Sequence, residues 1–195
     1  VDSHLHLDYY MIGKTDKEEN SSSTMFEAID IWNDFKKGTS KDQMKERIYG
    51  AVKECLSHGT QYIRAQTDCT DPNLTGIKAA LEVKEELKDK VTIQVVAFPQ
   101  NGMYSYKEGG KTGRNLVEEA LKLGCEVVGG IPHNELSREL GEKSIKEIVD
   151  LSLKYDKLID VHCDETDDEM ARFVEVLNAE VTINDIGEKT TASPT

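Results

Sequence analysis

The sequence of 195 residues has no apolar run near the ~18 residues that a membrane span needs. It is also poor in positive charge: 24 Lys and Arg stand against 37 Asp and Glu, which gives a formal net charge of −13. No cluster combines basic with aromatic residues. Such a surface repels anionic membranes and nucleic acid, so we expect neither as a partner. The strand-like first residues predict no signal peptide.

Closely spaced cysteines are missing as well. The four that are present lie far apart, without a Cys-x-x-Cys pair: Cys55, Cys69, Cys125 and Cys163. They predict reduced thiols in a cytoplasmic protein rather than disulfides or a zinc framework. The absence of Pro-Cys-x-x-Cys excludes one type of zinc deaminase. No glycine-rich dinucleotide or phosphate-binding motif is found, so nothing supports a nucleotide site.

What the sequence does contain is an alternation of apolar strand patterns with amphipathic helix patterns. Strands are predicted at 1–7, 61–69, 91–100, 126–133 and 158–163, with a weaker one at 190–193. Helices are predicted at 24–37, 41–58, 72–87, 115–123, 145–155 and 167–177. Ser40 followed by Gln43 has the pattern of a helix capping box. Polar loops are expected around 13–24 and 105–115, each after a strand end.

This alternation predicts an α/β fold with parallel strands, either an open doubly wound sheet or a (β/α)₈ barrel of the TIM type. The barrel is favoured because polar residues follow the carboxyl ends of several strands, and in a barrel these ends converge on one mouth. We see no linker and expect residues 1–195 to form one domain. The chain would supply only the first five to six β/α units.

The first strand carries a His-x-His motif, His4-Leu5-His6. Because side chains alternate along a strand, the two imidazoles face the same way and suit a divalent cation. Taken alone, the motif fits equally well two core histidines or a surface strand. The strand at 158–163 adds His162, followed by Glu165, which favours the metal site.

Four segments together resemble the cytosine deaminases of the metal-dependent amidohydrolase superfamily. They are His4-Leu-His-Leu-Asp8, Val95-Val-Ala-Phe-Pro-Gln100, Val128-Gly-Gly-Ile-Pro-His133 and Leu158-Ile-Asp-Val-His-Cys-Asp-Glu165. The similarity extends over essentially the whole chain. His-x-His is found throughout the superfamily, whereas the Phe-Pro-Gln and Val-His-Cys-Asp-Glu segments are more specific.

The resemblance implies a hydrolytic deaminase of pyrimidine salvage, acting on cytosine or a close cyclic amidine such as isocytosine or creatinine. His4, His6 and His162 would bind one divalent transition metal, Fe or Zn, which activates a water molecule. Glu165 would transfer protons, and Gln100 would hold the carbonyl–NH edge of a nucleobase-like substrate. The resemblance also implies assembly into homo-oligomers.

From the residues alone, other interpretations of these positions stay open. Glu165 also fits a solvent-facing loop carboxylate, and Gln100 fits a turn residue after a proline. His133 is interpreted as a buried histidine that shapes the pocket. Asp68 either orients a ligand histidine or pairs with Arg64, and we favour the structural pairing.

The sequence departs from the family pattern in two places. Gln66 stands where relatives usually carry a histidine, and Pro194 where they carry a further histidine ligand. We also expect the last two strands, with the aspartate that normally binds metal, and an N-terminal β-sandwich to be missing, as in a truncated product or part of a longer protein. The alternative function is therefore a catalytically incompetent barrel with a scaffold or binding role.

Overall fold

A computed structural model describes residues 1–12 and 20–193. Its centre is a six-stranded sheet with the order β1-β2-β3-β6-β7-β8, in which every neighbouring pair is parallel. The strands are β1 (Asp2–Leu5), β2 (Tyr62–Asp68), β3 (Thr92–Phe98), β6 (Val127–Gly130), β7 (Leu158–Val161) and β8 (Thr190–Ala192). All six predicted strands are therefore present, although most are shorter than their apolar patterns.

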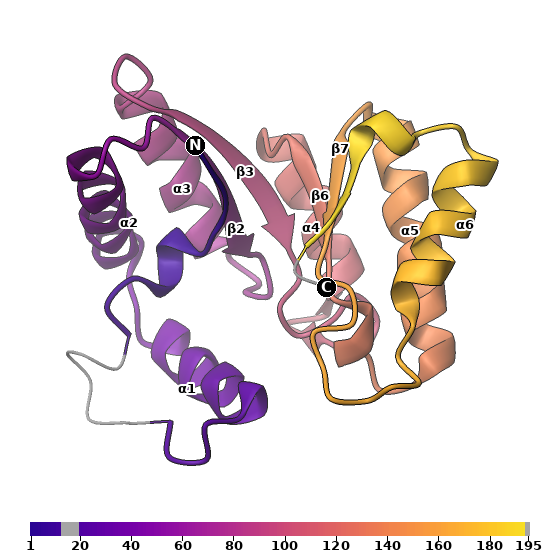
Figure 1. Ribbon diagram of the computed structural model, residues 1–195. Coiled ribbons are helices and arrows are strands. Elements are labelled where there is room, and N and C mark those ends of the chain that lie inside the picture. Colours follow the sequence, from indigo (N-terminus) through magenta and orange to yellow (C-terminus); the bar gives the residue numbers. More distant parts are fainter. Residues whose placement is uncertain (13–19, 194–195) are drawn as a thin grey trace.

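Helices follow the strands along the chain, and all but the first of them pack on the outside of the sheet, whereas the first lies beyond the carboxyl ends of the strands (Figure 1). They are α1 (Met25–Lys37), α2 (Lys41–Ser57), α3 (Thr75–Glu86), α4 (Gly113–Leu123), α5 (Arg138–Tyr155) and α6 (Phe173–Ile183). The capping box of Ser40 and Gln43 is confirmed at the start of α2. Short 3₁₀ turns, η1 (Leu7–Tyr9), η2 (Pro132–Asn134) and η3 (Gly187–Lys189), complete the connections. In the described residues, no helix combines the length and apolarity needed to cross a bilayer.

The two faces of the sheet bury different side chains. The larger core lies between sheet and helices and includes Ile63, Val95 and Ile159, which alternate with inward-facing residues. A smaller inner cluster contains Val96, Phe98, Val127 and Ile131. A sheet that buries apolar residues on both faces is typical of a barrel wall.

The strong curl of the sheet is shown by contacts between strands that are far apart in its order. The ends of β1 and β7 are four strand spacings apart, which would be roughly 19 Å in a flat sheet. Yet Nε2 of His6 lies 3.4 Å from Nε2 of His162. The fold is therefore a curled half-barrel with outer helices, as the sequence predicted.

Several boundaries differ from the sequence prediction, and three of them have a clear structural reason. Helix α5 begins at Arg138, seven residues before the predicted 145, because Ser137 caps its first turn. Helix α6 begins at Phe173 rather than at 167, because the carboxylate of Asp164 accepts hydrogen bonds from the amides of Phe173 and Val174 at 2.7 and 3.0 Å. The loop predicted at 105–115 contains a small hairpin of β4 (Lys107–Glu108) and β5 (Lys111–Thr112) and the first turn of α4.

Candidate active site

Three histidines meet at the carboxyl ends of β1 and β7. His4 lies in β1, His6 directly follows its last residue, and His162 directly follows β7. One ring nitrogen of each lies within 4.8 Å of those of the other two. The prediction that the first and fifth strand patterns would bring imidazoles together is thus confirmed in geometry.

These imidazoles are held in their neutral form. Burial lowers the pKa of His6 to about 4 and that of His162 to about 2, and in each case a neighbouring imidazole lowers it further. The pKa of His4 is lowered by burial as well, although Asp160 opposes the shift. At neutral pH each ring therefore keeps a lone pair that can coordinate a cation.

The spacing of the cluster fits a transition-metal ion. Two imidazole nitrogens bound at about 2.0–2.1 Å in tetrahedral geometry lie roughly 3.3–3.4 Å apart. The Nε2 atoms of His6 and His162 are 3.4 Å apart. Neutral imidazoles at this distance suit Zn or Fe better than Mg or Ca, which prefer oxygen ligands.

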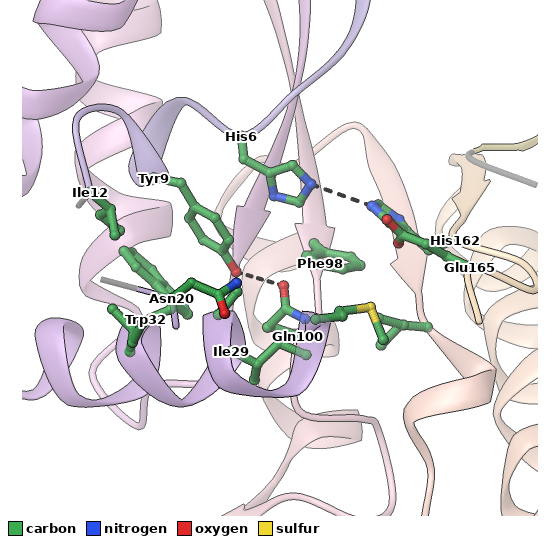
Figure 2. A pocket seen from close by; sticks show the side chains of 14 residues that line it. His6, Tyr9, Ile12, Asn20, Ile29, Trp32, Phe98, Gln100, His162 and Glu165 are labelled. Carbon is green, nitrogen blue, oxygen red and sulfur yellow. Dashed lines mark hydrogen bonds between the residues drawn. The ribbon is translucent and has the colours of Figure 1, made fainter. Parts of the chain in front are cut away.

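A pocket of about 350 Å³ opens beside the histidines (Figure 2). His6, Phe98 and His162 line one part of it, and the ring of Phe98 stacks on that of His162 with centroids 4.3 Å apart. Aromatic and aliphatic side chains supply most of the remaining wall: Tyr9, Ile12, Met25, Ile29, Ile31, Trp32 and Ile131. The pocket has the size and mixed lining of a small-molecule site.

Gln100 enters this pocket from the segment after β3. It is only 5 % exposed, and its Oε1 accepts a hydrogen bond of 2.6 Å from the hydroxyl of Tyr9. Its main-chain oxygen accepts from Asn134 Nδ2 at 2.8 Å, so backbone and side chain are both held. Within the described residues nothing accepts from Nε2 of Gln100, which leaves this donor for a ligand. Gln100 does follow Pro99 in a turn, as one interpretation of the sequence had it, and its side-chain amide also lines the pocket.

Glu165 reaches the same pocket from the segment after β7. The residue as a whole is exposed, but its carboxyl group lies beside His162 in the pocket wall (Figure 2). Partial burial raises the pKa of this carboxyl group above its usual value. A carboxyl group beside the histidines and open to the pocket is placed to act in general acid–base catalysis.

Asp68 is structural, as expected, but its partner is not Arg64. Its carboxylate accepts from Trp32 Nε1 at 2.6 Å and from Lys36 Nζ at 2.7 Å, which fastens α1 to the end of β2. Arg64 instead pairs with Asp160 across the inner face, at 2.8 Å. The proposed Asp68–Arg64 pair was therefore wrong, because Asp68 stands at the strand end, within reach of α1.

Asp8 is a second buried carboxyl group close to the site. Its Oδ2 accepts from the main-chain amide of Asp68 at 3.0 Å, and burial raises its pKa to about 7. It ties the turn after His6 to the end of β2. A role in orienting the first strand end follows from this contact.

Two other singled-out positions lie apart from the pocket wall. Gln66 is fully buried on β2, and neither atom of its amide has a hydrogen-bond partner in the described residues. His133 is half-buried in η2 and lines a separate hollow, but it lies close enough to His162 to help lower the pKa of that imidazole, so its part in shaping the pocket stays a prediction. Pro194, at which a ligand histidine was expected to be replaced, lies outside the described residues.

Tyr9 and Trp32 are among the pocket-lining residues that sequence reasoning missed. Tyr9 is the last residue of η1, the 3₁₀ turn that begins directly after His6, and Trp32 lies on the inner side of α1. Their two rings pack with centroids 4.2 Å apart. The single tryptophan on a helix after the first strand was a usable signal. No feature of the sequence indicated Tyr9, because this residue reaches the pocket only where the chain turns immediately after β1.

Comparison with known proteins assigns the chain to a family. A model of the amidohydrolase family matches residues 1–183. The chain therefore belongs to the amidohydrolase family. This agrees with the curled parallel sheet and with the histidines at its carboxyl end.

The chain is also similar to individual proteins of known structure or sequence. The chain superimposes on 5-methylcytosine deaminase from Klebsiella pneumoniae, solved with phosphonocytosine, with a TM-score of 0.91 and 39 % identity over 97 % of this chain and 45 % of that one. It is 32 % identical over 167 residues to N-isopropylammelide isopropyl amidohydrolase of Pseudomonas sp. (strain ADP), 83 % of this chain and 40 % of that protein. Pterin deaminase of Rhizobium rhizogenes is 26 % identical over 195 residues, 42 % of its length. The chain thus spans less than half the length of these relatives.

Proposed function

We propose that this chain carries the metal-binding and substrate-holding part of an enzyme that hydrolytically deaminates cytosine or a close cyclic amidine. The observation that carries the proposal is a cluster of three neutral imidazoles, two of which line one small pocket together with a buried amide and a carboxyl group of raised pKa. Likeness to 5-methylcytosine deaminase supports a pyrimidine as the substrate class.

His4, His6 and His162 would hold one divalent transition ion, Zn or Fe. When bound, such an ion supplies an activated water molecule at neutral pH. The histidines can play this part because burial keeps them uncharged, with their nitrogens at a suitable spacing.

Glu165 would move the protons. In the reaction the bond from the ring carbon to the exocyclic nitrogen breaks, a bond to the oxygen of water forms, and the nitrogen leaves as ammonia. The carboxylate of Glu165 would take one proton from water and deliver it to a ring nitrogen. As the bond to the exocyclic nitrogen breaks, it would carry the second proton, from the newly bound hydroxyl, to the leaving amine, and the product keeps a carbonyl oxygen. The raised pKa of Glu165 suits this exchange.

Gln100 would orient the ring. Its Oε1 is already bonded to Tyr9, and its Nε2 has no partner among residues 1–12 and 20–193, so the amide presents a donor to the ligand. An exocyclic carbonyl of a pyrimidine would accept this hydrogen bond. Phe98, which stacks on His162, provides an apolar surface for the ring.

A scaffold role without catalysis is the alternative, since the chain spans less than half the length of its relatives. Metal content and ammonia release separate the two. The enzyme should purify with about one equivalent of Zn or Fe, release ammonia from cytosine, isocytosine or creatinine, and lose this activity on chelation.

Glu165→Gln tests the assignment at the level of the residue. We expect ammonia release to fall roughly 10²–10⁴-fold with metal content unchanged, because the amide cannot exchange protons. Glu169→Gln, an exposed carboxylate nearby in the chain, is the control and should leave activity intact. A metal-loaded wild-type protein that neither binds cytosine nor releases ammonia from the three compounds contradicts the proposal.

A further inference from the structure

A chain of hydrogen bonds runs from the histidine cluster into the interior of the half-barrel. Nδ1 of His4 lies 3.2 Å from Oγ of Ser193, the residue directly after β8. The hydroxyl of Ser193 donates to Oδ1 of Asp160 on β7 at 2.7 Å. Oδ2 of Asp160 pairs with Arg64 on β2 at 2.8 Å. Side chains from β2, from β7 and from the residue after β8 thus meet behind the imidazole of His4 on β1.

The number of protons available determines which group donates in each of these hydrogen bonds. The Asp160 carboxylate, which faces Arg64, can only accept hydrogen bonds. The single hydroxyl proton of Ser193 is therefore used on Asp160, and its oxygen must accept the proton of His4 Nδ1. With the proton on Nδ1, the lone pair of His4 is on Nε2.

We infer that Ser193, held by Asp160, is a positioning residue that fixes the tautomer and ring orientation of His4 as a metal ligand. The inference rests on the metal site of the proposed function. Metal-binding histidines commonly donate their second N–H to an oxygen, and losing that partner weakens metal binding. Neither the family match nor the relatives assign a part to Ser193.

Among the three histidines, only His4 has a side-chain oxygen beside its Nδ1 in the described residues. Nδ1 of His6 and Nδ1 of His162 are buried, and neither has a hydrogen-bond partner in the described residues. Of the three rings, His4 is the one with an oxygen behind it, and it is also the one on the strand itself rather than after its end. Its orientation is therefore determined by side chains as well as by the backbone.

Asp160 is itself firmly placed. It is fully buried, and the guanidinium of Arg64 that it faces is also bonded to Gln94 Oε1 at 3.0 Å and to Thr191 Oγ1 at 3.2 Å. Because the acceptor cannot turn away, the hydroxyl of Ser193 has one favourable direction. This rigidity is what allows a serine to orient the imidazole.

The test is the affinity for Zn²⁺ and the absorption spectrum of the Co²⁺-loaded protein, neither of which depends on turnover. We expect Ser193→Ala to weaken Zn²⁺ binding about 10–100-fold in chelator competition. The Co²⁺ bands, which report ligand geometry, should shift. Ser193→Thr, which retains the hydroxyl, should bind within about threefold of wild type.

Ser144→Ala is the control, because Ser144 is a buried serine in α5 whose hydroxyl donates to the main-chain oxygen of Gly141, away from the histidines. It should leave Zn²⁺ affinity within about twofold of wild type. Unchanged affinity and spectrum for Ser193→Ala would overturn the inference, and so would a Thr variant that binds as weakly as the Ala variant. A wild-type protein that binds no Zn²⁺ or Co²⁺ would instead refute the metal site on which it rests.

Discussion

At the scale of single residues, the pair of Tyr9 and Gln100 determines what the pocket offers a ligand. An amide side chain can turn either its oxygen or its nitrogen towards a ligand. Here Tyr9 donates to the oxygen, and burial raises the pKa of Tyr9 well above its usual value, so the phenol keeps its proton. The amide nitrogen is thereby left facing the pocket.

Tyr9→Phe should therefore weaken binding of cytosine. The ring contacts with Trp32 and His6 remain, but the amide of Gln100 loses its anchor, and we expect the Kd or KM to rise roughly three- to tenfold. Titration calorimetry or steady-state kinetics measures the change. Tyr10→Phe removes an exposed hydroxyl bonded to Glu54 and serves as control. Equal affinities for wild type and Tyr9→Phe would show that Gln100 needs no anchor.

At the scale of elements, Glu118 joins two neighbouring helices of the outer layer. It lies on α4, and its carboxylate is bonded to Lys154 and Tyr155 of α5, both at 2.6 Å, and to Arg114 one turn earlier. These partners hold the pKa of Glu118 at about 2, below its ordinary value of 4.5. The side chain is 12 % exposed, so the contact is part of the helix interface.

The lowered pKa predicts a pH-dependent stability. The carboxylate stabilises the fold fully above about pH 5, and this contribution is lost as pH falls from 4.5 towards 2, where the folded protein also takes up the proton. Glu118→Gln should lower the free energy of unfolding by about 1–2 kcal/mol at pH 6, and this difference should shrink below pH 4.5 to a small fraction at about pH 2. Urea unfolding at both pH values measures it. A gap that stays constant with pH contradicts the prediction.

Elements also show where sequence patterns are sufficient and where they are not. The start of α2 was predictable because Ser40 and Gln43 cap each other within one turn. The start of α6 was not, because its cap is Asp164, nine residues before Phe173. The β-like pattern at 158–163 likewise could not show that the strand ends at Val161 and that the catalytic candidates follow in irregular backbone.

At the scale of the whole molecule, the curl of the sheet brings charged groups together across the interior. Arg64 and Asp160 lie on β2 and β7, three strand spacings apart, which would be roughly 14 Å in a flat sheet. They form an ion pair of 2.8 Å with side chains only 19 % and 0 % exposed. The half-barrel therefore has a polar layer beneath its histidine cluster.

A double-mutant cycle tests this closure. Asp160→Asn leaves a largely buried guanidinium without its counter-charge and should cost about 3 kcal/mol of unfolding free energy. In the Asp160→Asn background, Arg64→Met should lower the free energy of unfolding by less than it does in the wild-type protein. The expected coupling energy between the two substitutions is at least about 1 kcal/mol. Urea denaturation of the four proteins gives the cycle. The exposed pair of Lys37 and Asp34 is the control, with coupling near zero. Additive effects at Arg64 and Asp160 would mean that the pair does not stabilise the curl.

By itself, the sequence determined the α/β alternation, the six strands, and the two segments that carry the histidines, because strand periodicity and local capping act over a few residues. It also indicated the family through short motifs around His4, Gln100 and His162. Only the tertiary structure decided which partners those groups have: Tyr9 for Gln100, Ser193 for His4, Lys36 rather than Arg64 for Asp68. These contacts depend on how far the sheet curls and where each strand ends, and both are set by packing between residues distant in the chain.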